Sequence, residues 1–416
     1  MATSQNLLFL AHRVPYPPDK GEKIRTWHVL LHLAKSHRVH LGCLADEPIE
    51  QIQLAELKRV CASVGCFRVS GNLQKLRALA RMRSGRPLTV DVFYSDALRN
   101  WTDCTLKRER IQRIFAVCSS MAGYVIDQKE CLRILDMIDV DSEKWRAYAQ
   151  TRRWPVRAIY RREADALLGF ERQLVHQFDK TLFASQAEAK DFARLAPEVL
   201  DRIEWLSNGV DAEMFAPELR FMSPYVKSSC NLVFTGVMNY WPNVDAVVWF
   251  VHSVLPMVAR EFPEVQFHIV GSSPTRAVLR LARYPNVSIT NRVSDVRPFI
   301  AHADVAVAPL RIARGVQNKV LEAMAMARPV VARPEAVEGI RAIAGQDLLV
   351  ASNPEEMACR IREVLKGEYP GLGDRARSTI ARNHSWPDNL RRLDDLLRPS
   401  GDQRDNSPRP STPIAV

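Results

Sequence analysis

Long apolar runs, paired cysteines and metal-ligand spacings are all missing from this chain of 416 residues. No apolar stretch approaches the roughly 18 residues that a spanning helix needs, so none is expected. The eight cysteines are scattered, without a CxxC pair or a Cys/His ligand pattern. This predicts reduced thiols, a cytoplasmic setting and no structural metal. No basic residue precedes the apolar segment Leu7–Leu10, which predicts a buried strand and not a signal peptide.

Acidic residues are also in short supply. Lys and Arg number 58 against 47 Asp and Glu, which gives a formal net charge of +11. Such an excess favours anionic partners, namely a nucleotide diphosphate, anionic lipid or nucleic acid. A nucleic-acid reading motif with interleaved aromatic residues is absent, so nucleic acid is not the expected partner. The length suits two domains.

Apolar strands and helical segments alternate along the chain, and the alternation begins again near residue 230. Strands are expected at LLFLAH, RVHLGCLA, FAVCSS, RILDMIDV and TLFASQ, and later at NLVFTG, QFHIVGSS, VSIT, DVAVAP and PVVAR. Two such series predict an α/β protein with two Rossmann-like domains facing across a cleft. The expected boundaries are 1–206 and 207–385, then a helix at 386–398 that returns to the first domain, then a disordered tail at 399–416.

The stretch from Asp304 to Gly339 is the most informative. It reads as a buried strand, a turn at Gly315, a short helix carrying Lys319 and Glu322, and a second strand after Pro329. A strand–turn–helix edge presents unpaired N–H groups and a positive dipole end to an anion. A lysine and a carboxylate beside it could hold a phosphate and a sugar hydroxyl. The pattern therefore predicts a nucleotide-sugar site.

Several segments resemble GT-B retaining glycosyltransferases of family four. They are SNGVDAEMF, FTGVMNYWPNVDA, HIVGSSP, SDVRPFIAHADVAVAPL and GVQNKVLEAMAMARPVV, in the order seen in that family. The opening PYPPDKGEKIRTWHVLLHLAKSHRVHL and the segment DMIDVDSEKWRAYA resemble the sugar transferases of bacterial PEP-CTERM/EpsH exopolysaccharide clusters. The resemblance implies the GT-B fold, and sugar transfer from a nucleotide-diphosphate donor to a lipid-linked or oligosaccharide acceptor. It implies no metal or other cofactor.

The resemblance also assigns residues to the donor. Glu322 matches the family glutamate that binds the ribose, whereas Arg314 stands where the family has its first glutamate. The sequence TNRV replaces the usual glycine turn near the base, so base contacts are expected from the backbone of Arg292 and Val293. Arg311 is a further candidate for neutralising phosphate.

The remaining donor residues lie around the helix. Lys319, or backbone N–H groups at Val316 and Gln317, would meet the phosphates and stabilise the charge on the leaving diphosphate. Asn318 could bind the sugar or a phosphate, or it could cap the helix. The alternative for Lys319 and Glu322 is a solvated ion pair worth about 0.2–0.5 kcal/mol.

Four further residues are candidates outside this helix. Gly236 permits close approach of backbone to ligand, or it forms only a tight turn. Gly21 lies in a basic loop and would admit the sugar and phosphate, or it is a surface turn. Asp139 and Asp141 end a strand and would orient sugar or acceptor hydroxyls; the alternative is that Asp141 caps a helix.

Two basic segments could rest on anionic lipid, which would place the protein on the inner face of the cytoplasmic membrane. They are 73–83 and 152–162. The alternative is a helix with an ordinary solvated face. Two other functions stay open: a nucleotide-sugar epimerase on the same fold, and a non-enzymatic binder of anionic polymer.

Overall fold

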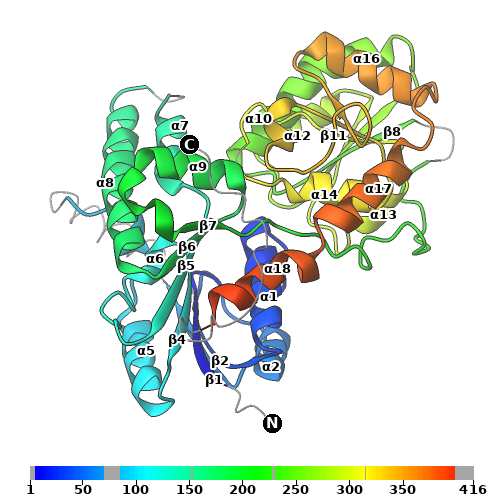
Figure 1. Ribbon diagram of the computed structural model, residues 1–416. Helices are drawn as coiled ribbons and strands as arrows, with labels where there is room; N and C mark the ends of the chain where they lie inside the picture. The colour runs from blue at the N-terminus through cyan, green and yellow to red at the C-terminus, as the bar shows by residue number, and fades with distance from the viewer. Residues whose placement is uncertain (1–4, 70–84, 151–152, 227–229, 314, 399–416) are drawn as a thin grey trace. The chain divides into compact units, whose positions relative to one another are not determined.

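The computed structural model describes residues 5–69, 85–150, 153–226, 230–313 and 315–398. The chain forms two compact units. One comprises Met1–Leu206 with the C-terminal stretch from Leu390, and the other comprises Ser207–Asn389. Each unit contains its own parallel sheet with helices packed around it (Figure 1). The basic segment 73–83 and the tail 399–416 lie outside the described residues.

The sheet of the first unit has seven strands in the order β3-β2-β1-β4-β5-β6-β7. Its central strands are apolar on both faces, as in β1, where Leu7–Ala11 are all buried. Parallel sheets covered on both faces require such continuous apolar runs. The strands are β1 (Gln5–Ala11), β2 (His37–Ala45), β3 (Ser63–Arg68), β4 (Arg113–Val117), β5 (Leu132–Ile138), β6 (Lys180–Phe183) and β7 (Ile203–Trp205).

Helices connect these strands and cover the sheet. They are α1 (Gly21–Leu33), α2 (Gln51–Val60), α4 (Leu88–Val92), α5 (Asp96–Arg108), α6 (Ser119–Ala122), α7 (Asp141–Gln150), α8 (Val156–Gln177), α9 (Gln186–Leu195) and the 3₁₀ helix η2 (Pro197–Arg202). Ser95 and Ser185 cap α5 and α9 by accepting a backbone N–H, as serine does at helix starts.

A buried ion pair ties α1 to the sheet. Arg25 of α1 donates from Nε to Asp136 Oδ2 at 2.7 Å and from Nη2 to Oδ1 at 2.9 Å, and Asp136 lies in β5. Both side chains are almost fully buried. The two-pronged geometry compensates for their desolvation, so the loss of either partner would leave a buried charge unpaired.

The last helix, α18 (Trp386–Leu396), carries the chain from the second unit back to the first. Arg113 Nε donates to the carbonyl of Leu397 at 3.0 Å, and His32 Nε2 lies 2.8 Å from Asp394 Oδ1. These contacts hold the end of the described chain against the first sheet.

The sheet of the second unit has six strands in the order β10-β9-β8-β11-β12-β13. The strands are β8 (Asn231–Thr235), β9 (Gln266–Val270), β10 (Val287–Ile289), β11 (Val305–Ala308), β12 (Val330–Ala332) and β13 (Leu349–Val350). The helical segments are α10 (Trp241–Trp249), the π-helical η3 (Phe250–Val254), α11 (Leu255–Ala259), α12 (Arg276–Leu279), η4 (Arg280–Arg283), α13 (Arg297–Ala301), α14 (Asn318–Ala325), α15 (Pro334–Val337), α16 (Pro354–Leu365) and α17 (Leu372–Asn383).

One helical stretch, Trp241–Ala259, is long and apolar enough to cross a membrane by length and composition alone. The lack of long apolar runs in the sequence had predicted no such stretch. Half of its most apolar window is buried inside the unit, and Ala246, Phe250 and Val254 belong to the core beneath it. Its apolar residues therefore cover the sheet.

In each unit the strand order reverses beside the first strand. In the second unit β8 lies between β9 and β11, and in the first unit β1 lies between β2 and β4. The connections that leave the carboxyl ends of such a central pair run to opposite sides of the sheet. Open α/β sheets bind ligands at this position, so the residues that follow β8 and β11 are candidates for a binding site.

Candidate active site

Two turns that contain glycine pass close to each other at the carboxyl edge of the second sheet. Gly236 follows β8, and Gly271 follows β9. A Cβ on Gly271 would lie 1.7 Å from the carbonyl oxygen of Gly236, and a Cβ on Gly236 would lie 3.2 Å from Lys319 Nζ. Only glycine permits the first of these approaches. The turn at Gly236 therefore leaves room for the Lys319 ammonium group.

The helix that carries Lys319 starts without a side-chain cap. Gly315 precedes it with φ of +64°, a left-handed conformation that glycine adopts without strain. Gln317 occupies the N-cap position of α14, but its side chain donates to the carbonyl of Gly315 at 3.2 Å instead of capping the helix. The first turn holds no acidic residue. Its N–H groups and positive dipole end are thus suited to an anion.

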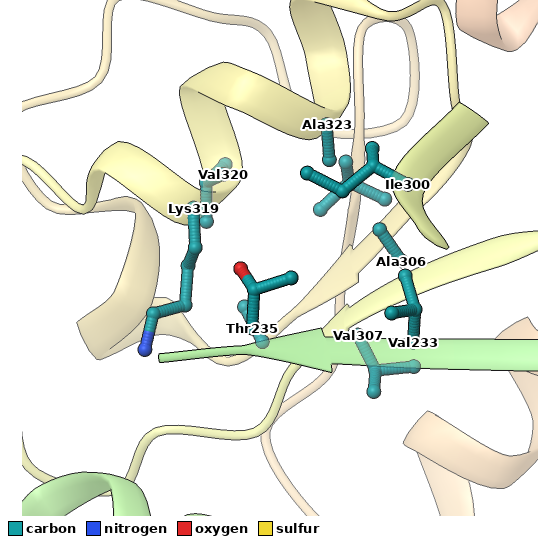
Figure 2. A pocket seen from close by; sticks show the side chains of 10 residues that line it. Val233, Thr235, Ile300, Ala306, Val307, Lys319, Val320 and Ala323 are labelled. Atoms are coloured by element: carbon teal, nitrogen blue, oxygen red, sulfur yellow. The ribbon is translucent and has the colours of Figure 1, made fainter. Parts of the chain in front are cut away.

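The Lys319 side chain runs from α14 toward the end of β8 (Figure 2). Its Nζ donates to Asn243 Oδ1 at 2.7 Å and lies 4.2 Å from the centroid of the Phe234 ring. Asn243 is held in turn, because its Nδ2 donates to the carbonyl of Val237 at 3.0 Å. Burial lowers the pKa of Lys319 to about 7, although the charge of Glu322 opposes the shift. An anion bound here would restore the charged form.

Beneath Lys319 lies a small cavity between α14 and the sheet, lined by Thr235, Val307 and Val320 among others (Figure 2). Its volume is about 10 Å³, which is at most enough for one water molecule. The cavity is therefore a packing feature, and a ligand would sit beyond it, at the ammonium end of the lysine.

Glu322 lies one turn after Lys319 on the same helix. Burial raises the pKa of its carboxyl to about 7, and the charge of Lys319 opposes this rise. Among the described residues none donates a hydrogen bond to this carboxylate. Both side chains are partly buried, so they do not form the solvated ion pair that their spacing alone would allow.

Asn318 is the first residue of α14, so it does not occupy the N-cap position. Its Oδ1 receives a long 3.5 Å contact from Asn208 Nδ2. Its own Nδ2 is buried and has no hydrogen-bond partner in the described part of the chain. A buried amide donor of this kind is costly unless a ligand or water satisfies it.

The segment after β10 reaches the same edge. Gly271 N donates to Thr290 Oγ1 at 3.1 Å, which joins the TNRV segment to the glycine turn. Arg292 is exposed, and Val293 is half-buried against the core. Arg311 Nη2 is bound to Asp245 Oδ1 at 2.5 Å, and a contact of Arg311 with phosphate stays a prediction. Arg314 lies outside the described residues.

Comparison with known proteins identifies this part of the chain. Residues 229–367 match the family described as "Glycosyl transferases group 1". This part of the chain is similar to the group 1 glycosyl transferases. The match bears out the prediction of a glycosyltransferase enzyme and speaks against a non-enzymatic binder of anionic polymers.

Solved structures extend the likeness to the whole fold. Sucrose-phosphate synthase from Thermosynechococcus elongatus superposes with a TM-score of 0.67 at 14% identity, covering 94% of this chain and 98% of that chain. Anabaena HepE, solved in complex with UDP-glucose, gives 0.66 at 12% identity, covering 94% and 99%. The prediction of the GT-B class, with two parallel-sheet α/β domains, is confirmed.

A curated relative is an uncharacterized 44.6 kDa protein in the cps region of Klebsiella pneumoniae. It is 20% identical over 368 residues, which cover 82% of this chain and 85% of that protein. The narrower resemblance to PEP-CTERM/EpsH clusters stays a prediction.

The candidates outside the glycosyl transferase domain lie in the first unit. Gly21 is the exposed first residue of α1. Asp139 follows β5, and Asp141 begins α7. Lys144 Nζ lies 2.6 Å from Asp139 Oδ2 and 3.2 Å from Asp141 Oδ1. The two carboxylates therefore share one cation at the carboxyl edge of the first sheet.

Sequence reasoning did not single out another group at this edge. His12 follows β1, and its Nε2 lies 4.0 Å from the Sγ of Cys118, which follows β4. Burial lowers the pKa of His12 to about 4, with Glu22 opposing. Arg13 pairs with Glu22 at 2.8 Å and with Asp46 at 3.2 Å. The position of His12 directly after the first buried strand could have indicated a site residue, because ligands bind at this edge of such sheets.

Proposed function

We propose that the chain transfers a sugar, with retention at the anomeric carbon, from a nucleoside diphosphate to a lipid-linked saccharide in exopolysaccharide synthesis. The glycosyl transferase domain supports the donor half of this proposal. HepE, which shares the fold, was solved with UDP-glucose, and the Klebsiella relative is encoded in a cps region. A soluble oligosaccharide acceptor would serve the same chemistry.

The observation that carries the proposal is the uncapped start of α14 beside Lys319. In our assignment the diphosphate accepts hydrogen bonds from the backbone N–H groups of Val316 and Gln317. It also forms an ion pair with Lys319. Asn318 Nδ2, buried without a partner among the described residues, donates to a sugar or phosphate oxygen. The Glu322 carboxylate accepts hydrogen bonds from the ribose hydroxyls.

The base would lie along the turn after β10. The backbone of Arg292 and Val293 follows Thr290, which accepts the 3.1 Å hydrogen bond from Gly271 N. Gly236, where a side chain would meet Asn243 and Lys319, leaves room for the Lys319 ammonium group that binds the diphosphate. Backbone contacts of this kind recognise a base without a dedicated side chain.

Sugar transfer then needs charge stabilisation more than a nucleophile. The bond between the anomeric carbon and the phosphate oxygen breaks as the acceptor oxygen bonds to the same face of the sugar. The acceptor proton passes to the departing phosphate oxygen. Lys319 and the helix dipole stabilise the growing negative charge, while Asp139 and Asp141 orient hydroxyl groups.

The experiment combines a donor screen with product analysis. The protein is incubated with UDP-sugars and other nucleoside-diphosphate sugars, with and without a lipid-linked saccharide acceptor, and the products are separated and their anomeric configuration determined by NMR. We expect an acceptor-dependent product with the donor's configuration. Isomerised or hydrolysed donor without acceptor would establish the epimerase alternative instead, and an inverted product would refute retention.

Glu322→Gln and Glu338→Gln provide a matched pair of variants. Both remove a carboxylate from the second unit, but Glu338 ends the short helix α15 and has no role in the proposed site. We expect only Glu322→Gln to weaken donor binding, by about 10-fold or more, because hydrogen bonds to charged groups are worth about 1.5–3 kcal/mol. Equal affinities would remove Glu322 from the donor site.

A further inference from the structure

Large apolar side chains are exposed at the start of α8 and just before it. Trp154 is 83% exposed, and Val156 and Ile159, at the start of α8, are 39% and 36% exposed. Residues 153–159 are exposed without interruption. Exposing three such side chains together is unfavourable in water, and it marks a surface that contacts something apolar. We call residues 153–161 the hairpin tip.

The hairpin tip is also strongly basic. Arg153, Arg157 and Arg161 are exposed, and none of them forms an ion pair with a carboxylate in the described part of the chain. The nearest acidic residue along α8 is Glu163, which is buried. Its carboxylate accepts hydrogen bonds from the backbone N–H groups of Leu88 and Thr89, at 2.9 Å each. Within the described ranges, no carboxylate pairs with these three arginines of the hairpin tip.

Contacts between the two helices hold the hairpin tip in place. The rings of Trp145 in α7 and Tyr160 in α8 meet edge to face, with centroids 5.0 Å apart. Arg146 Nη2 pairs with Asp165 Oδ1 at 3.3 Å. Figure 1 shows the two helices side by side. The exposed side chains are thus carried on a supported helix pair.

We propose that the hairpin tip docks on an anionic lipid bilayer. Trp154, Val156 and Ile159 would enter the boundary between headgroups and acyl chains, where tryptophan is favoured. Arg153, Arg157 and Arg161 would bind lipid phosphates, which attract each basic residue near the surface. A surface that combines exposed apolar side chains with exposed arginines fits a bilayer, because the bilayer offers both environments in one plane.

This inference does not depend on the proposed transfer reaction. Vesicle binding and donor binding are measured separately, so the two can fail independently. It also makes no use of the basic segment 73–83 or of Arg152, both of which lie outside the described residues.

The test is co-sedimentation of the full chain with phosphatidylcholine vesicles that contain or lack phosphatidylglycerol. The triple variant Arg153→Ser, Arg157→Ser, Arg161→Ser is compared with the unmodified protein. With about 1 kcal/mol for each arginine, we expect about a hundredfold weaker binding to anionic vesicles. Trp154→Ser should also weaken binding, and the Trp154 fluorescence should shift to the blue on vesicles.

The matched control removes the same charge elsewhere. Arg276, Arg280 and Arg283 are exposed on α12 and η4, next to the half-exposed Leu279. Changing these three to Ser should leave vesicle binding within about twofold if the hairpin tip is the docking surface. An equal loss in both triple variants would show general charge attraction and overturn the proposal.

Three other results would also overturn it: unchanged binding of the tip variant, equal binding to vesicles without phosphatidylglycerol, or a tip that joins two copies of the chain. In the last case Trp154→Ser would convert a dimer to a monomer in analytical ultracentrifugation and leave vesicle binding unchanged. Each variant is checked for unaltered thermal unfolding, so that a folding defect is not read as a binding defect.

Discussion

Replacing Lys319 by Met should abolish a proton uptake that accompanies binding of UDP. In the free protein, burial lowers the pKa of Lys319 to about 7. At pH 8 such a lysine is about nine-tenths neutral. A diphosphate bound at α14 favours the charged form, so binding should take up about 0.9 proton per site at this pH. Glu322, whose pKa is raised to about 7, is already ionised at pH 8 and contributes little.

Calorimetry measures this uptake directly. UDP is titrated at pH 8 in two buffers that differ in ionisation enthalpy, and the difference in binding heat gives the number of protons. The terminal phosphate of UDP is already ionised at this pH. For Lys319→Met we expect no uptake and an affinity lower by about 10- to 150-fold, the equivalent of 1.5–3 kcal/mol for a charge-assisted hydrogen bond.

The control is Lys366→Met. Lys366 pairs with Glu261 at 2.6 Å on the surface of the same unit, so the variant removes one lysine without touching α14. It should keep both the proton uptake and the affinity. If UDP binds without proton uptake, or if Lys319→Met retains the uptake, the reasoning about this lysine is wrong.

Three further predictions concern a glycine turn beside the candidate site and two buried charged groups of the first unit. Gly271→Ala should weaken UDP binding at least 10-fold, measured by calorimetry. The new Cβ would lie 1.7 Å from a backbone oxygen, so the turn must move. Gly169→Ala, with open space around its Cβ, should leave UDP binding unchanged. Arg25→Met should destabilise the first unit by about 3–5 kcal/mol in urea unfolding, because it leaves Asp136 buried and unpaired; a loss under 1 kcal/mol would contradict this. Glu171, with its pKa raised from 4.5 to about 8 by burial, holds its proton when folded, so stability should fall as pH rises from about 4.5 to 8. Glu171→Gln should flatten that fall in the melting temperature, and an unchanged slope would refute the assignment.

The sequence alone was enough to predict the two parallel sheets and the residues around α14. Continuous apolar runs such as Leu7–Leu10 have few alternatives to a buried parallel strand. Gly315 and Pro329 mark the ends of a short helix by local backbone chemistry. The strand–turn–helix pattern pointed to Lys319, and the resemblance to family-four GT-B glycosyltransferases pointed to Glu322. Their roles stay predictions that the variants above can test.

Other features depend on contacts between residues far apart in the sequence. The Arg311–Asp245 ion pair, the Lys319–Asn243 hydrogen bond and the close approach of Gly271 to Gly236 join segments that follow different strands. No local pattern encodes such pairings, because they follow from strand order and from how closely two backbones pass. The helical stretch Trp241–Ala259 is a further example. Its apolar composition is visible in the sequence, but only packing decided that half of its most apolar window would be buried. Sequence thus determined which elements form, whereas tertiary structure decided which side chains they bring together, and therefore which charges remain available for a ligand.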